Sequence, residues 1–167
     1  MLSQKMTGAL NVQLNKEMYS GYLYMGMSAS CTSLELKGFA NQFMIQYQEE
    51  MAHAMKFYDY IHRQGNRVKL LTIDQPQIDF DSPLAMFGKT LSHEKFVTGL
   101  IHGLVDLADE ENDSSTRDFL QWFVKEQVEE EETAGSLLGR VKSTGDSNEA
   151  LMNLDKELAG RVFHPPA

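Results

Sequence analysis

Four long stretches of this sequence repeat apolar residues in alternating steps of three and four, the period of one face of an α-helix. These stretches are rich in Leu, Met, Glu, Lys, Gln and Ala, which favour helices. The pattern predicts helices over about residues 3–34, 38–64, 83–110 and 114–143, and a shorter fifth helix near 147–160. The sequence therefore predicts an all-α protein.

Turn-forming residues support the same boundaries. Gly65 suits a helix C-terminus, Ser82-Pro83 suits a helix start, and Gly145 precedes Ser147, a candidate N-cap. Between the second and third helices, residues 66–82 can extend over about 56 Å, more than the length of about 45 Å expected for a 30-residue helix. We therefore expect a single domain over residues 1–167, a four-helix bundle of two antiparallel hairpins joined by a long crossover.

Each predicted apolar stripe is interrupted by polar residues near the middle of its helix. In the third helix the stripe is expected to contain Leu84, Phe87, Leu91, Glu94, Thr98, Ile101, Val105 and Ala108. The six interrupting residues are Glu17, Glu50, His53, Glu94, Gln127 and Glu130. In an antiparallel hairpin, two residues lie level when the turn falls midway between them. The midpoints of the pairs 17/50 and 94/127 fall at positions 33–34 and 110–111, at the predicted turns, so both hairpins are expected to carry their polar residues at one level.

The two halves of the chain also match each other. Glu94 and Gln127 follow Glu17 and Glu50 by the same offset of 77 residues, and Glu130 follows His53 by that offset. An internal pseudo-repeat is therefore expected, and each half contributes one polar residue from its first helix and two from its second.

Four of the six residues are carboxylates, and no Lys or Arg occupies these positions. Unpaired carboxylates in a low-dielectric core are costly, whereas two divalent cations would neutralise four of them. Glu50 and His53 form a Glu-x-x-His pair on one helical face, the arrangement found in carboxylate-bridged di-iron bundles. The layer therefore predicts a dinuclear metal centre. Tyr24 lies two turns after Glu17 on the same stripe, so its hydroxyl is expected to point toward this layer.

Composition narrows the function classes. The 167 residues include 24 acidic and 15 basic side chains, a formal charge of -9 that argues against nucleic acid as a partner. Cys31 is the only cysteine, so neither a disulfide framework nor a Cys-x-x-Cys metal site is expected. The sequence shows no signal peptide and no run of 18 apolar residues, so we expect no membrane partner and a cytoplasmic location.

Several longer strings resemble the prokaryotic non-haem ferritins, and the resemblance covers essentially the whole chain. They are Leu14-Asn15-Lys16-Glu17-Met18-Tyr19-Ser20-Gly21-Tyr22-Leu23-Tyr24, Gln48-Glu49-Glu50-Met51-Ala52-His53-Ala54, His93-Glu94, and Leu120-Gln121-Trp122-Phe123-Val124-Lys125-Glu126-Gln127-Val128-Glu129-Glu130-Glu131. The resemblance implies a ferritin-like fold, and an iron-storage protein that acts as a ferroxidase, an oxidoreductase that uses Fe(II) and dioxygen. It also implies self-association into a hollow homo-oligomeric shell of 24 subunits.

The resemblance also implies site residues. Glu17, Glu50 and His53 would bind one iron, and Glu50, Glu94 and Glu130 the second, with Glu50 bridging. Gln127 would sit beside the pair, either as a neighbour of the ligands or as a weak ligand itself. A third iron site would draw on further acids: Glu49, Glu126, Glu129 and Glu130. Tyr24 and Trp122 would lie close enough to donate hydrogen bonds or electrons.

The chain differs from three related families at specific positions, which favours the non-haem ferritins over them. Bacterioferritins carry a second Glu-x-x-His where this chain has Gln127-x-x-Glu130, and their haem-binding Met falls near Ala52, so no haem is expected. The single cysteine excludes the four-cysteine iron domain of rubrerythrins. Mini-ferritins build their site between subunits, with a different His/Asp pattern and no fifth helix after the fourth.

Two other functions remain open from the residues alone. One is a di-iron or di-manganese oxygenase, or a catalase, that uses the same layer with an organic or peroxide substrate. The other is a metal-free helical interaction protein. The acids between positions 106 and 118 fit either an iron-access channel or a solvated helix turn. His62, His93, His102 and His164 are expected to be surface or packing residues.

Overall fold

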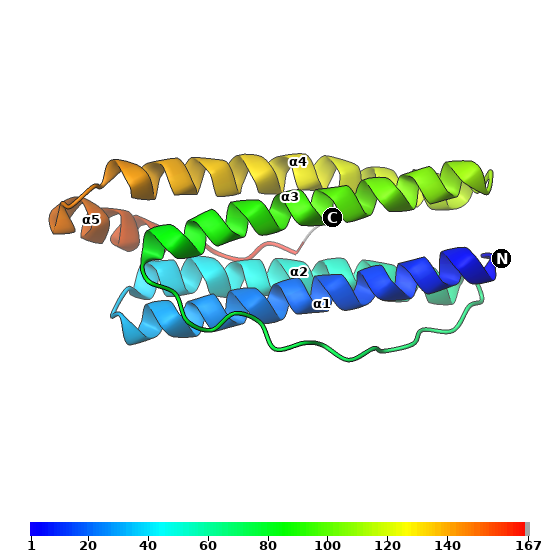
Figure 1. Cartoon of the computed structure of the whole chain (residues 1–167), viewed down its shortest axis with the longest axis horizontal. Helices are drawn as coiled ribbons and strands as arrows, with labels where there is room; N and C mark the ends of the chain where they lie inside the picture. The colour runs from blue at the N-terminus through cyan, green and yellow to red at the C-terminus, as the bar shows by residue number, and fades with distance from the viewer. Residues whose placement is uncertain (166–167) are drawn as a thin grey trace.

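The computed structural model describes residues 1–165, which form five helices and no strand. The helices are α1 (Gln4–Ser33), α2 (Lys37–Arg63), α3 (Pro83–Glu110), α4 (Ser114–Ser143) and α5 (Asn148–Leu158). Figure 1 shows the four long helices side by side, with α5 at the end of the bundle where α2 and α3 begin. The predicted all-α fold is confirmed, and every predicted boundary lies within two residues of the observed one.

The crossover between α2 and α3 runs along α1 (Figure 1). Near its start, the Asn11 side chain donates to the carbonyl of Arg67 and accepts from the backbone N–H of Lys69. Near its end, Ser30 donates to the carbonyl of Ile78. These bonds pair the crossover with opposite ends of α1, so α3 begins at the same end of the bundle as α2 and runs parallel to it.

Local side chains cap four of the five helix starts. Ser3, Ser82, Asp113 and Ser147 each accept a hydrogen bond from a backbone N–H in the first turn of their helix. Helix α2 follows Leu36 and has no such local cap. Instead, Asp155 of α5 accepts from the N–H of Phe39 at 2.9 Å. Gly38 permits this contact, because a Cβ there would lie 1.6 Å from the carbonyl oxygen of Asp155.

The buried apolar residues form two clusters, one at each end of the bundle. One cluster includes Leu10, Leu14, Phe57, Ile101 and Phe123, and the other includes Leu23, Phe43, Phe87, Leu137 and Val141. The six predicted polar residues fall between the two clusters on every long helix, and all six are buried. The core is therefore apolar at both ends and polar at mid-length.

The buried stripe of α3 differs from the predicted one. Leu84, expected in the stripe, is 42% exposed, while Thr90, His93 and Val97 are buried although the steps of three and four left them out. Helix α3 contacts α1 as well as α4, so it buries a wider face than a single seam provides. None of the helices in residues 1–165 combines the length and apolarity that a bilayer-spanning segment requires.

Candidate metal centre

The first half of the polar layer brings together three side chains from α1 and α2. Glu17 is 1% exposed, Glu50 3% and His53 1%. One potential ligand atom from each lies within 4.8 Å of the others, and His53 Nδ1 is 3.4 Å from a Glu50 oxygen. Gln13, one turn before Glu17, donates to its Oε1 at 2.8 Å. The other Glu17 oxygen is buried and has no hydrogen-bond partner among the described residues, as suits a cation ligand.

The second half centres on Glu94 of α3, which is fully buried. The Tyr24 hydroxyl donates to its Oε1, and the Gln127 side-chain amide donates to its Oε2 at 3.3 Å. The same amide also donates to the backbone carbonyl of Glu94 at 3.2 Å, and to the Thr98 hydroxyl at 3.3 Å. A hydroxyl and an amide thus hold the Glu94 carboxylate in a fixed orientation.

Glu130 of α4 joins the two halves of the layer. Burial and the charge of Glu94 together raise the pKa of Glu130 to about 8, against an opposing effect of His53. Ligand atoms of His53, Glu126 and Glu130 lie within 4.8 Å of one another, and His53 Nε2 is 3.8 Å from a Glu126 oxygen. His53 therefore contacts carboxylates through both ring nitrogens.

Burial raises the pKa values of the other acids in the layer as well, those of Glu17, Glu50 and Glu94. Burial lowers the pKa of His53, but the neighbouring carboxylates of Glu126, Glu50 and Glu17 outweigh this effect and raise the pKa well above its ordinary value. The metal-free layer therefore retains protons, and divalent cations would displace them. Oxygen ligands with one imidazole suit iron and other divalent transition metals.

The acids expected at a third iron site lie at the rim of the layer. Glu126 is grouped with Glu130 as described above, while Glu49 forms an ion pair with Arg161 at 2.7 Å. Burial raises the pKa of Glu49, and Arg161 opposes this shift. Glu129 is exposed, and among residues 1–165 it belongs to neither group of side chains that lie close enough together to hold a metal ion.

The two aromatic residues singled out in the sequence both lie beside the layer. Burial raises the pKa of Tyr24 well above its ordinary value, and the neighbouring Glu94 adds to this, so its hydroxyl stays protonated and can donate. The Trp122 ring meets the His53 ring edge-on, with centroids 5.4 Å apart.

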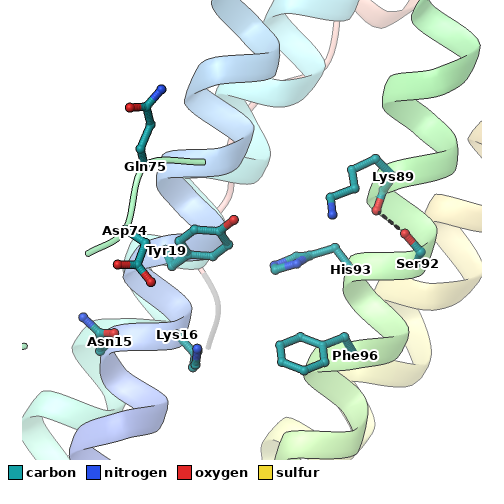
Figure 2. Close-up of a pocket in the computed structure, with 9 residues that line it drawn as sticks. All are labelled: Asn15, Lys16, Tyr19, Asp74, Gln75, Lys89, Ser92, His93 and Phe96. Atoms are coloured by element: carbon teal, nitrogen blue, oxygen red, sulfur yellow. Dashed lines mark hydrogen bonds between the residues drawn. The ribbon is translucent and has the colours of Figure 1, made fainter. Parts of the chain in front are cut away.

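A cavity of about 480 Å³ opens between α1, the crossover and α3. Figure 2 shows Tyr19 and His93 pointing toward each other from α1 and α3, with Lys89 above His93. His93 Nε2 lies 2.8 Å from the Ser20 hydroxyl, and its ring meets Tyr24 edge-on at 6.0 Å. Burial lowers the pKa of His93 to about 4, aided by Lys89 and Lys16. A neutral imidazole therefore lies between this cavity and Tyr24.

Four residues that contact the layer or its neighbours had no specific role predicted from the sequence: Gln13, His93, Thr98 and Arg161. Gln13 had a usable signal, since it precedes Glu17 by four residues and so shares its helical face. Arg161 had none, because its contact with Glu49 spans 112 positions.

A four-helix bundle with a buried layer of acids and a histidine belongs to the ferritin-like class of metal-binding bundles. Residues 7–144 match the ferritin family, described as a ferritin-like domain. The bacterial non-heme ferritin of Staphylococcus epidermidis is 40% identical over 164 residues, which cover 98% of this chain and 99% of the relative. That of Staphylococcus aureus strain USA300 is 39% identical over 163 residues, 98% of each chain.

Solved structures agree with these relatives. An open pore ferritin from the archaeon Archaeoglobus fulgidus superposes with a TM-score of 0.96 at 46% identity, covering 97% of this chain and 100% of that one. A closed form of the same ferritin, engineered by mutagenesis, gives 0.97 at 46% identity, with coverage of 98% and 100%. This chain belongs to the ferritin family, whose function is iron storage, and the family predicted from its sequence is confirmed.

Proposed function

We propose that this ferritin is a ferroxidase that oxidises Fe(II) with dioxygen at a di-iron centre and stores the ferric product inside a hollow oligomer. The observation that carries the proposal is the buried layer of four carboxylates and one imidazole at mid-length of the bundle. An acid layer of this kind is costly without cations, so the metal-free geometry is best explained as a preformed site for two of them.

In this proposal Glu17, Glu50 and His53 hold one Fe(II), and Glu50, Glu94 and Glu130 hold the other. The mutual distances of Glu17, Glu50 and His53 support the first set. The electrostatic effect of Glu94 on the pKa values of both Glu50 and Glu130 supports the second, because it requires these groups to lie close together. Glu50 is the bridging carboxylate, since it belongs to both sets.

The proposed chemistry balances without a further reactant. Each of two Fe(II) ions loses one electron, and dioxygen accepts the two electrons together with two protons to give hydrogen peroxide. The two Fe(III) ions then take four water molecules to form two ferric oxyhydroxide units and release six protons. Hard carboxylate ligands favour this direction because they stabilise Fe(III) over Fe(II).

The remaining predicted residues have supporting roles. Tyr24 and Gln127 orient Glu94 through their donated hydrogen bonds. Glu49, Glu126, Glu129 and Glu130 form the third iron site, through which iron passes from the di-iron centre toward the store. A cytoplasmic location, where iron is available as Fe(II), suits this function.

Self-association into a shell of 24 subunits is also part of the proposal. Exposed apolar side chains on α1 and the crossover support an interface there, because apolar surface left open to solvent often marks contact sites. These side chains are exposed at 46% or more: Val12, Tyr22, Leu70, Leu71 and Ile78.

Aerobic titration of the purified apo-protein with Fe(II) tests the function. We expect about one dioxygen consumed for every two irons in the first phase, and continued loading of many irons per chain into a particle of unchanged large size. Uptake that stops at two irons per chain would instead identify an oxygenase. A lack of rapid oxidation together with no shift of the melting temperature on adding Fe(II) would identify a metal-free protein.

A further inference from the structure

The segment after α5 turns back along α2. The Asn41 side chain donates to the backbone carbonyls of Leu158 and Arg161, each at 3.0 Å. Farther along, Phe163 and Pro165 line a cavity together with residues of α2 between Tyr47 and Asp59. In Figure 1 this C-terminal trace runs back from α5 toward the middle of the bundle. The chain beyond α5 thus extends to the level of the buried acid layer.

Arg161 extends from this segment to the rim of the layer. Its Nη2 lies 2.7 Å from Oε1 of Glu49, and the two side chains are 30% and 19% exposed. Its other terminal nitrogen, Nη1, is buried and has no hydrogen-bond partner among the described residues. The contact is therefore a partly buried ion pair rather than a flexible surface pair.

Further side chains that could bind a cation lie around this ion pair. Glu126 and Glu49 each raise the pKa of Glu130, and Glu126 raises that of Glu49, so the three carboxylates lie within electrostatic reach of one another. His53 Nε2 points toward this group from the other side, 3.8 Å from a Glu126 oxygen, with no hydrogen bond although its ring is almost fully buried. The group thus brings together three carboxylates and an imidazole nitrogen that has no hydrogen bond.

We propose that the guanidinium of Arg161 is a built-in cation that occupies the Glu49 corner of the third iron site, and that iron gains Glu49 as a ligand only when Arg161 moves away. This inference rests on the proposed function, since it concerns the passage of iron out of the di-iron centre. Arg161 is a positioning residue here and does not take part in the oxidation.

The chemistry of arginine makes it suitable for this role. A guanidinium keeps its charge at all physiological pH values, so it cannot leave Glu49 by losing a proton. It leaves only when its side chain swings out or when a doubly charged ion outcompetes it. Arg161 therefore lowers the affinity of the third site without changing the two sites of the buried layer. A charge-assisted hydrogen bond of this kind corresponds to a difference of about tenfold in affinity.

The test uses the full-length assembled protein and anaerobic binding of Zn(II), a redox-inert probe. In the wild type we expect two tight sites and one weaker site per chain. In Arg161→Gln the third site should bind Zn(II) about tenfold more tightly while the two tight sites stay unchanged. Arg161→Lys keeps a cation beside Glu49 and should behave as the wild type.

Arg140→Gln is the matched control, because Arg140 pairs with Glu157 of α5, at an exposed position away from the acid layer. It should leave all three sites unchanged. If the third site is equally weak or weaker in Arg161→Gln while the two tight sites stay intact, the inference is overturned. Arg161 would then only hold the C-terminal segment against the bundle. Absence of two tight sites in the wild type would instead overturn the proposed function.

A second variant covers the case in which Arg161→Gln does not assemble. Glu49→Gln removes both the partner of Arg161 and the ligand that the inference assigns to the third metal. We expect the third Zn(II) site to disappear in this variant while the two tight sites remain. A third site with unchanged affinity would show that Glu49 is not its ligand, and the inference would fail.

Discussion

The two hairpins of the bundle share one frame but hold their acids in different ways. In the α1–α2 half, Glu50 contacts His53 and Glu17, so three ligand-type groups face one another. In the α3–α4 half, offset by 77 residues, Glu94 is held by the Tyr24 hydroxyl and the Gln127 amide. The first half supplies an imidazole and two carboxylates, and the second supplies oxygen ligands oriented by neutral donors. Two metals in this layer would therefore have unequal surroundings, with Glu50 shared between them.

The helix starts differ between the halves in a related way. Asp113 caps α4 from the adjacent turn, whereas α2 is capped by Asp155, which belongs to α5. The helix that carries Glu50 and His53 thus depends on the fifth helix for its start, and the helix that carries Gln127 and Glu130 does not. Substitutions in the acid layer and at the helix starts can test both differences.

The largest expected effect follows removal of the shared carboxylate. Glu50→Ala should slow the initial oxidation of Fe(II) by about 100-fold or more, because both metals lose a ligand. The rate is measured by stopped-flow absorbance of the ferric product, and gel filtration checks that the particle size is unchanged.

Asp59→Ala is the control for this substitution, since Asp59 is an exposed acid on the same helix. It should oxidise iron at the wild-type rate. If Glu50→Ala also kept the wild-type rate in intact particles, Glu50 would be excluded as the bridge.

The second prediction concerns pH and the protons held by the metal-free layer. Burial raises the pKa of Glu130 from 4.5 to about 8 in the folded state, so the stability that this group contributes is complete below 4.5 and is lost as pH rises through about 8. The free energy of unfolding of the metal-free protein should therefore fall between pH 4.5 and about 8, by up to about 1.4 kcal/mol per pH unit for each proton. The thermal unfolding midpoint should fall with it.

Glu130→Gln should flatten this slope, while Glu129→Gln, at an exposed neighbouring position, should leave it unchanged. Thermal melts of both variants and the wild type from pH 5 upward provide the measurement. Equal slopes in all three proteins would mean that Glu130 does not hold the proton.

The third prediction concerns the orientation of Glu94. Tyr24→Phe removes one of its two side-chain donors and should slow the first oxidation phase by about tenfold, with Fe(II) still bound. Tyr22→Phe alters an exposed tyrosine on the same helix and should have no effect. A wild-type rate in Tyr24→Phe would show that the Tyr24 hydroxyl does not contribute to the oxidation.

The smallest effects are expected at the helix caps. Asp113→Ala should lower the free energy of unfolding by about 1 kcal/mol, and Asp155→Ala by about 1–2 kcal/mol because it also frees a buried N–H of α2. Chemical denaturation measures both differences. Hydrogen exchange should rise at the start of α2 in the Asp155 variant alone, and equal exchange there in both variants would contradict the dependence of α2 on α5.

The sequence predicted the fold because helical period and turn residues act locally. The five helices follow from steps of three and four, and from Ser82-Pro83, Gly65 and Gly145 at their ends. The polar layer was predictable because two residues equally far from the turn of an antiparallel hairpin lie level with each other, as Glu17 and Glu50 do. For the α3 stripe the prediction was wrong at Leu84, because a helix packed against two neighbours buries a wider face than one seam.

The contacts around the layer were not predictable from the pattern. The bonds from Ser20 to His93 and from Arg161 to Glu49 join positions far apart in the sequence, and they depend on where side chains point after packing. The acids between positions 106 and 118 illustrate the same limit. Glu110 pairs with Lys5, Glu111 accepts from Ser3, and Asp113 caps α4, so three of them fasten the α3–α4 turn.

Anomalous X-ray diffraction from crystals soaked anaerobically with Fe(II) measures the central feature most directly. The account predicts two strong iron peaks per chain inside the bundle, one between Glu17, Glu50 and His53 and the other between Glu50, Glu94 and Glu130. Iron found only among the exposed acids of the α3–α4 turn, with no peak in the buried layer, would contradict it.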